Sequence, residues 1–223
     1  MYLTNSLSRT QPLLSFAAAF TLSIAAAHAV VPGLVPGAVL SPAPSSTSPV
    51  GGSVLFTTGP IPFTAGTFSG TLTSSAISGD SSNPYGGLTF TYDINNFTGS
   101  RDDIARLTVS SFDHYLTAAS YNSTTPVGGL APFSISRSAN GEVVGFNFLV
   151  PSLSPGAASA LLVVQTDSPA FAFATAALID GSSTTVGALA PVPEPSALTL
   201  AGLGFLGLLG YGWRRSRRHR GSN

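Results

Sequence analysis

The stretch Leu88-Thr-Phe-Thr-Tyr-Asp-Ile94 carries the strongest fold signal in the chain. Apolar residues occupy every second position of it, and Thr89, Thr91 and Asp93 fill the positions between. Successive side chains of a β-strand point to opposite faces, so this alternation predicts a strand with one face on a core and one in water. The stretch therefore indicates a half-buried strand of an antiparallel sheet.

Similar runs occur on both sides of this stretch. Residues 67–73 and 107–112 alternate in the same way, and residues 143–150 place Val144, Phe146, Phe148 and Val150 on one face. Residues 160–166 form a continuous apolar run, which predicts a strand covered on both faces. Residues 170–179 and 184–189 complete the set.

Turn signals separate these runs, and the pair Asn140-Gly141 favours a hairpin. About seven to nine short strands with no helical period are typical of a sandwich. We therefore predict an all-β fold, an antiparallel β-sandwich of jelly-roll or Ig-like type, over residues 53–190.

The charges are sparse and unevenly placed along the 223 residues. Charged residues make up 8% of the chain, and there is no Lys and no Cys. Residues 30–193 hold three arginines against eight acids, a net charge of −5. An acidic body without a basic stripe argues against nucleic-acid binding. The lack of Cys excludes disulfides and thiolate metal sites.

The first 29 residues have the pattern of a secretory signal peptide. Arg9 precedes an apolar run over residues 13–27, and Ala27-His28-Ala29 is an A-x-A cleavage site, so we expect signal peptidase to recognise Ala27 and Ala29. Residues 30–52 are rich in Pro, Gly and Ser, a composition that predicts a linker.

Three groups of residues in the body could form a catalytic, metal-binding or sugar-binding site. His114, beside Asp113, is the one histidine of the body and would have to be the base of any Ser-His-Asp hydrolase. Carboxylate and amide oxygens that could surround Ca²⁺ come from Asp93, Asn95, Asp102 and Asp103, although their spacing departs from a calcium loop. Aromatic rings for stacking on sugars come from Phe63, Tyr85, Tyr115 and Tyr121. In each group turn chemistry or rim packing is an adequate explanation, so we predict no catalytic residue, no metal and no cofactor.

The end of the chain combines an apolar run with a block of arginines. Residues 197–212 carry no charge, and with Trp213 they predict a transmembrane helix over residues 197–213. Five stop-transfer arginines follow: Arg214, Arg215, Arg217, Arg218 and Arg220. The positive-inside rule then places the C-terminus in the cytoplasm and the body outside.

Immediately before the apolar run stands Val192-Pro193-Glu194-Pro195. This motif, the apolar helix and the arginine cluster, in that order at the C-terminus, resemble the PEP-CTERM protein-sorting domain over residues 191–220. The resemblance implies recognition of Val192, Pro193, Glu194 and Pro195 by an exosortase, a membrane cysteine transpeptidase. It implies a precursor in the inner membrane that is cut near the motif and passed on to the cell envelope of a biofilm-forming Gram-negative bacterium.

From these observations we expect a non-enzymatic, exported envelope or matrix protein. Its expected partners are the exosortase, the inner membrane and extracellular polysaccharide. Two alternatives stay open on the same anchor: a carbohydrate-binding module for exopolysaccharide, and a hydrolase that depends on His114.

Overall fold

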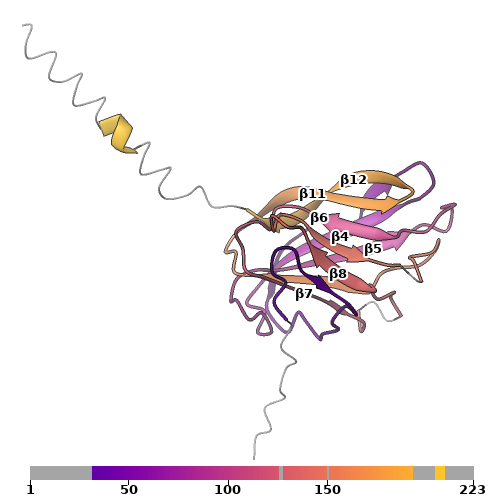
Figure 1. The fold of residues 1–223 in the computed structure, drawn as a ribbon, viewed down its shortest axis with the longest axis horizontal. Helices are drawn as coiled ribbons and strands as arrows, with labels where there is room; N and C mark the ends of the chain where they lie inside the picture. The colour runs from indigo at the N-terminus through magenta and orange to yellow at the C-terminus, as the bar shows by residue number, and fades with distance from the viewer. Residues whose placement is uncertain (1–31, 126–127, 150, 193–203, 209–223) are drawn as a thin grey trace, which may run out of the picture.

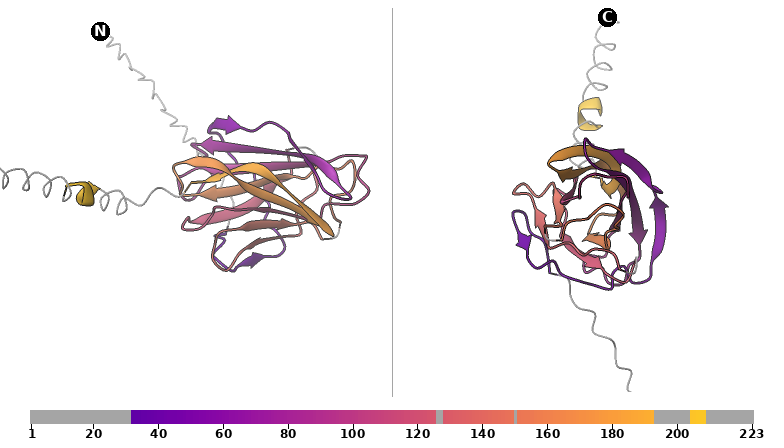
Figure 2. Two further views of the ribbon diagram at one scale, coloured as in Figure 1. Left: turned by 90° about the horizontal axis from the view of Figure 1, so that it is seen from above. Right: turned by 90° about the vertical axis from the view of Figure 1, so that its right-hand side faces the viewer.

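Two antiparallel sheets face each other across a shared apolar core in the computed structural model of the chain (Figure 1). The structure describes residues 32–125, 128–149, 151–192 and 204–208. The chain is all-β over its body, as predicted, and the end-on view shows the strands surrounding the core (Figure 2).

Each sheet contains six strands. Sheet A has the spatial order β2 (Ser53–Thr57), β4 (Ser69–Ser78), β5 (Thr89–Asn96), β10 (Leu161–Thr166) and β7 (Thr117–Asn122), and β3 (Ile61–Thr64) also pairs with β4. Sheet B has the order β1 (Val39–Leu40), β8 (Ser134–Arg137), β9 (Val144–Asn147), β6 (Arg106–Val109), β11 (Phe171–Asp180) and β12 (Ser182–Pro191).

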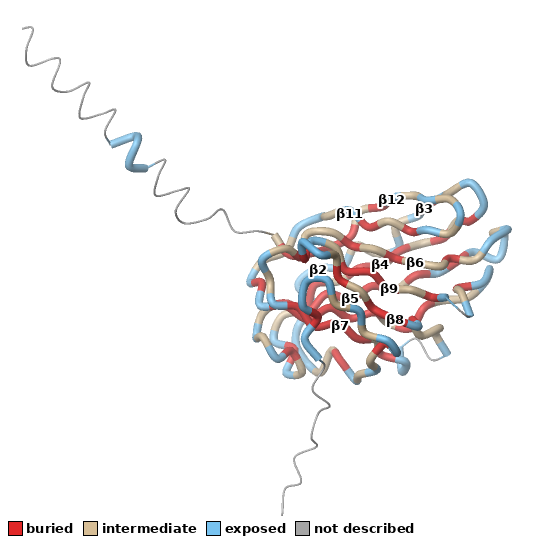
Figure 3. The backbone as a smooth tube through the Cα atoms, in the orientation of Figure 1, coloured by how far each residue is buried: buried red, intermediate tan, exposed pale blue. Residues whose placement is uncertain are grey.

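The stretch that predicted the fold forms most of β5, in the middle of sheet A. Its alternate residues Leu88, Phe90, Tyr92 and Ile94 are buried, with exposed fractions of 4% or 0%. They meet Phe146, Phe148 and other side chains of sheet B in the core, where buried residues lie between the sheets (Figure 3). The buried Tyr92 hydroxyl donates a hydrogen bond of 2.7 Å to the Leu189 carbonyl and so joins the two sheets.

The hairpin predicted from Asn140-Gly141 joins β8 to β9. Arg137 pairs with Val144, and the Ser138 amide donates to the Val143 carbonyl, so the turn residues are 139–142. Gly141 has a φ of 79°, a conformation that glycine adopts without steric cost.

The segment predicted as a linker over residues 30–52 is instead packed on the sandwich where it is described. Leu34 is fully buried and its amide donates to the Thr117 carbonyl at 2.7 Å. The Ala43 amide donates to the Phe133 carbonyl at 2.9 Å, and β1 pairs with β8. Prolines and glycines suit an irregular ordered segment as well as a linker, and the composition does not reveal such distant partners.

The same segment covers part of the outer face of sheet A, which the alternation predicted to face water. Thr89 and Thr91 are buried there, with exposed fractions of 0% and 5%. Ser48 approaches the outer side of β10, where the Gln165 amide donates to its hydroxyl at 3.3 Å. Asp93, which was expected in water on the same face of β5, is half-buried.

Asp80 is the centre of this covered polar layer. Its carboxylate accepts hydrogen bonds from the Val50 amide, the Ser82 amide and hydroxyl, the Thr89 hydroxyl and the Gln165 amide, at 2.6–3.0 Å. Burial raises the pKa of Asp80, but these hydrogen bonds to the charged form outweigh it and lower the pKa below its ordinary value. The ionised carboxylate thus binds residue 50 of the covering segment to the sheet.

The predicted signal peptide, residues 1–29, lies outside the described residues, as do Arg214, Arg215, Arg217, Arg218 and Arg220. Of the predicted transmembrane segment 197–213, residues 204–208 are described and are helical. Among the described residues, no helix is both long and apolar enough to span a membrane.

Candidate functional site

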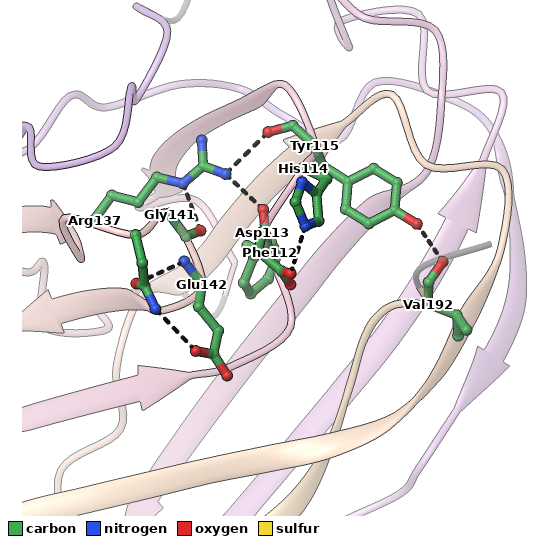
Figure 4. Close-up of polar contacts among 9 residues, drawn as sticks. Phe112, Asp113, His114, Tyr115, Arg137, Gly141, Glu142 and Val192 are labelled. Atoms are coloured by element: carbon green, nitrogen blue, oxygen red, sulfur yellow. Dashed lines mark hydrogen bonds and ion pairs between the residues drawn. The ribbon is translucent and has the colours of Figure 1, made fainter. Parts of the chain in front are cut away.

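The candidate site is the place where the chain leaves the sandwich, at the end of β12. Pro191 is the last residue of β12 and pairs with Phe171 of β11. Val192 follows it, and its amide donates to the Ala170 carbonyl at 3.4 Å. The Tyr115 hydroxyl donates to the Val192 carbonyl, across 77 residues of sequence (Figure 4). The fold therefore holds the chain up to the first residue of the predicted sorting motif.

The strand that leads to this exit is firmly held in the core. Ala188, Leu189 and Ala190 are fully buried. The Leu189 amide donates to the Ser74 hydroxyl at 3.0 Å, and its carbonyl accepts from Tyr92. These contacts join β12, a strand of sheet B, to β4 and β5 of sheet A, so the exit is a fixed point of the body.

The loop that carries Tyr115 is fixed in turn by Arg137 (Figure 4). The Arg137 guanidinium donates to four carbonyls: Gly141 at 2.8 Å, Leu34 at 2.9 Å, Phe112 at 2.5 Å and Tyr115 at 3.0 Å. Only 6% of Arg137 is exposed. One side chain thus joins the covering segment, the β8–β9 turn and the loop beside the exit.

The electrostatics of Arg137 fit this structural role. Burial lowers the pKa of Arg137, and the charges of Tyr85, Asp113 and Asp167 oppose that effect. Arginine stays charged after such a shift because its ordinary pKa is far above neutrality. A buried guanidinium is costly unless its donors are satisfied, and here backbone carbonyls satisfy them.

His114 lies on the same loop but points into solvent. Its side chain is 84% exposed, and its Nε2 lies 3.2 Å from an Asp113 carboxylate oxygen. Its φ of 68° shows that the residue occupies a tight turn. Within the described residues no hydrogen bond joins His114 to a serine hydroxyl, so the geometry adds no support to the hydrolase hypothesis.

The structure does not bring together into a site the four residues that were considered as possible calcium ligands, Asp93, Asn95, Asp102 and Asp103. Asp93 and Asn95 lie on the outer face of β5, whereas Asp102 and Asp103 lie in the loop before β6. The described part of the chain contains no group of three or more metal-ligating side chains. Burial raises the pKa of Asp93, and burial and the charges of Asp102 and Asp103 raise the pKa of Asp180.

The aromatic residues selected from the sequence have different positions. Phe63 is a core residue, with 4% exposed, and packs edge-on against Phe68. Tyr85 and Tyr115 line a cavity of about 250 Å³ beside the exit, with Leu34 and Leu116 among the other lining residues. Tyr121 is half-buried in β7.

A second group of aromatic residues was missed at the sequence level. Phe56 of β2 stacks on Phe171 of β11 with ring centroids 6.2 Å apart, and meets Phe173 edge-on at 6.1 Å. Phe173 is 63% exposed and Phe56 is 43% exposed. The signal in the sequence was Phe171-Ala-Phe173, which places two rings on one face of a strand.

A wider hollow of about 560 Å³ lies between the loops at residues 128–131 and 151–158. Its lining consists of small or apolar residues and two serines, Ser152 and Ser154. This composition offers no charged group to a ligand.

Comparison with known proteins identifies the exit segment. The PEP-CTERM protein-sorting motif family matches residues 191–218, which confirms the resemblance drawn from the sequence. No curated protein and no solved structure matches the chain. The match begins at Pro191, the final residue of β12, so the matched segment starts at the end of the last described strand.

Proposed function

We propose that the protein is made as a membrane-anchored precursor. The premise is that the chain carries a PEP-CTERM sorting motif and is therefore an exosortase-sorted extracellular protein. The signal peptide directs export, and the apolar segment 197–213 holds the precursor in the inner membrane with the arginines inside. The exosortase recognises Val192, Pro193, Glu194 and Pro195, removes the anchor and passes the body on to the envelope.

One observation carries this proposal: the fold ends at the motif. Strand β12 is paired through Pro191, and Val192 is held by Tyr115 and Ala170. The last described strand of the body thus ends next to the motif, and the proposal requires that the enzyme reach Pro193 and the residues after it without opening the sandwich. Prolines at positions 193 and 195 lock φ and remove backbone donors, which disfavours continuation of the strand or an early start of a helix.

For the body itself we propose a non-enzymatic role as a structural component of the envelope or matrix. This proposal is supported by the two-sheet core, by the acidic surface of the body and by the scattering of the titratable groups over different loops and strands. Asp80 and Arg137, the most strongly hydrogen-bonded charged groups, use their polar atoms to bind backbone and neighbouring side chains.

A polysaccharide-binding role is the second candidate, and the exposed aromatic group of Phe56, Phe171 and Phe173 favours it. Sugar rings stack on exposed aromatic faces because one face of a pyranose ring presents a patch of C–H groups to the aromatic ring. Retention of the body on the host's own exopolysaccharide would be measured for wild type, for Phe173→Ala and for a matched variant, Phe133→Ala. Loss of retention in Phe173→Ala alone would support binding, and no retention of the wild type would refute it.

The sorting proposal is tested by the fractionation of cells that express Glu194→Ala. We expect the variant to stay in the inner-membrane fraction while the wild type leaves it. Glu142→Ala removes an exposed acid of the body and serves as the matched control, which should behave as wild type. Release of Glu194→Ala at the wild-type rate would contradict the role assigned to the motif.

A further inference from the structure

We infer that, in the anchored precursor, the exit end of the body rests in the lipid headgroup layer and contacts it through an apolar exit rim formed by Val35, Leu116, Phe56 and Phe173. This inference rests on the proposed function, because it takes residues 197–213 as the membrane-spanning segment. It assigns the rim a lipid surface as its partner.

The length of chain after the exit carries the argument. Val192 is fixed to the body, and Ala197 is the first residue of the apolar run. The five steps between them span at most about 18 Å when fully extended. The headgroup layer is about 5–8 Å thick on each side of the hydrocarbon core. The surface around Val192 is therefore kept within about 10–13 Å of the outer edge of the headgroup layer, so the exit end of the body can reach the headgroups.

Exposed apolar side chains occur on both sides of Val192. On the Tyr115 side, Leu116 is 58% exposed and Val35 is 64% exposed, and both line the cavity beside the exit. On the β11 side, the ring of Phe56 contacts Phe171, the partner of Pro191, and Phe173. Single exposed apolar residues are common on protein surfaces, but the tether keeps these four within reach of lipid.

The charges at this end define the kind of contact. The acids Asp113, Glu142 and Asp167 lie in its turns, and the guanidinium of Arg137 is buried. An acidic surface gains nothing from anionic lipids, so the contact depends on the apolar rim and the tether. Removal of the tether by the exosortase then frees the body from the membrane, as delivery to the envelope requires.

The chain has a single Trp, Trp213 in the tail, which makes tryptophan a clean reporter. In a Trp213→Phe background, Leu116→Trp would place a reporter in the rim. Phe133→Trp would place a matched reporter at a 52% exposed site on the β8 end away from the exit. Each full-length chain would be reconstituted in zwitterionic vesicles that contain a lipid with a quencher near the headgroup.

We expect the quencher to reduce Leu116→Trp emission at least about twofold more strongly than Phe133→Trp emission, as for an aromatic ring at a membrane interface. Equal quenching at the two sites, with the tail inserted, would overturn the inference. Val35→Trp provides a second rim reporter if Leu116→Trp does not fold.

The unmodified chain separates this result from failure of the anchor. Quenching of its Trp213 reports insertion of the tail. If Trp213 is not quenched, the membrane-anchored precursor itself is refuted, and the inference falls with it. If Trp213 is quenched and the rim reporters are not, the anchor stands and the lipid contact is wrong.

Discussion

Replacement of Arg137 by Met would test whether one buried cation holds the exit end of the body together. The guanidinium joins Leu34 of the covering segment, Gly141 of the β8–β9 turn, and Phe112 and Tyr115 of the exit loop. Methionine is unbranched, fills the space of the arginine's aliphatic stem and has no donor, so the variant removes the hydrogen bonds while it keeps the apolar packing of the stem.

The size of the effect follows from the partners left behind. The Phe112 carbonyl also accepts from the Tyr115 amide, and the Tyr115 carbonyl also accepts from the Thr117 hydroxyl. The carbonyls of Leu34 and Gly141 lose the donor that the structure shows for them, and a buried acceptor without a donor costs about 1–3 kcal/mol. We therefore expect a loss of about 2–6 kcal/mol in the free energy of unfolding.

Urea unfolding of the full chain in mild detergent, followed by near-UV circular dichroism, measures this loss. Arg106→Met is the matched control, because the Arg106 guanidinium makes a single 3.3 Å hydrogen bond to the Ser136 hydroxyl. We expect the control to lose about 1 kcal/mol or less. Equal losses in the two variants would refute the role assigned to Arg137.

Three further variants test other parts of the structure. Asp80→Asn should be less stable than wild type at pH 7. The difference in unfolding free energy should shrink as the pH falls through the lowered pKa of Asp80, below 3.8, because protonation removes the same charge from the wild type. A pH-independent difference in urea unfolding would contradict this. Tyr92→Phe should lower the free energy of unfolding by about 1–3 kcal/mol, because the buried Leu189 carbonyl loses a donor. An unchanged urea midpoint would count against the hydrogen bond between the sheets. His114→Ala should leave stability within about 0.5 kcal/mol of wild type, because its side chain is exposed; a larger change in the melting temperature would show an unrecognised contact.

The strand pattern was predictable because alternation is a local property of the sequence. Residues 88–94 showed their buried face directly, and residues 160–166 showed a strand covered on both faces. The sandwich followed from the number of such strands. The pairing order, in which β6 lies between β9 and β11, depends on contacts between distant residues and left no local signal.

The covering segment was not predictable for the same reason. Its prolines and glycines indicated a linker, but Leu34 bonds Thr117, and Ser48 bonds Asn122 and Gln165, which lie 74 and 117 positions further along the chain. Thr89 and Thr91 were expected in water because their cover comes from that segment. A threonine in the sequence indicates a strand, because threonine has a high β propensity, but it does not indicate which segment covers that position.

The sorting motif was recognisable from the sequence, whereas its attachment to the body was not. Three adjacent signals, the Pro-Glu-Pro stretch, the apolar run and the arginines, identify it locally, and the family match confirms it. The Tyr115 contact with Val192 spans 77 residues and requires the whole fold. Phe173 was overlooked because an apolar residue in a strand suggests core, although this one is exposed.

The most direct test of the account is the mass of the mature C-terminus in cells with and without the exosortase. The account predicts that the envelope form of wild-type cells ends within residues 193–196, so that β12 is intact and the apolar run is gone. Cells without the enzyme should retain the chain through Arg220. Intact Arg220 in the envelope form of wild-type cells, or an end within β12, would contradict it.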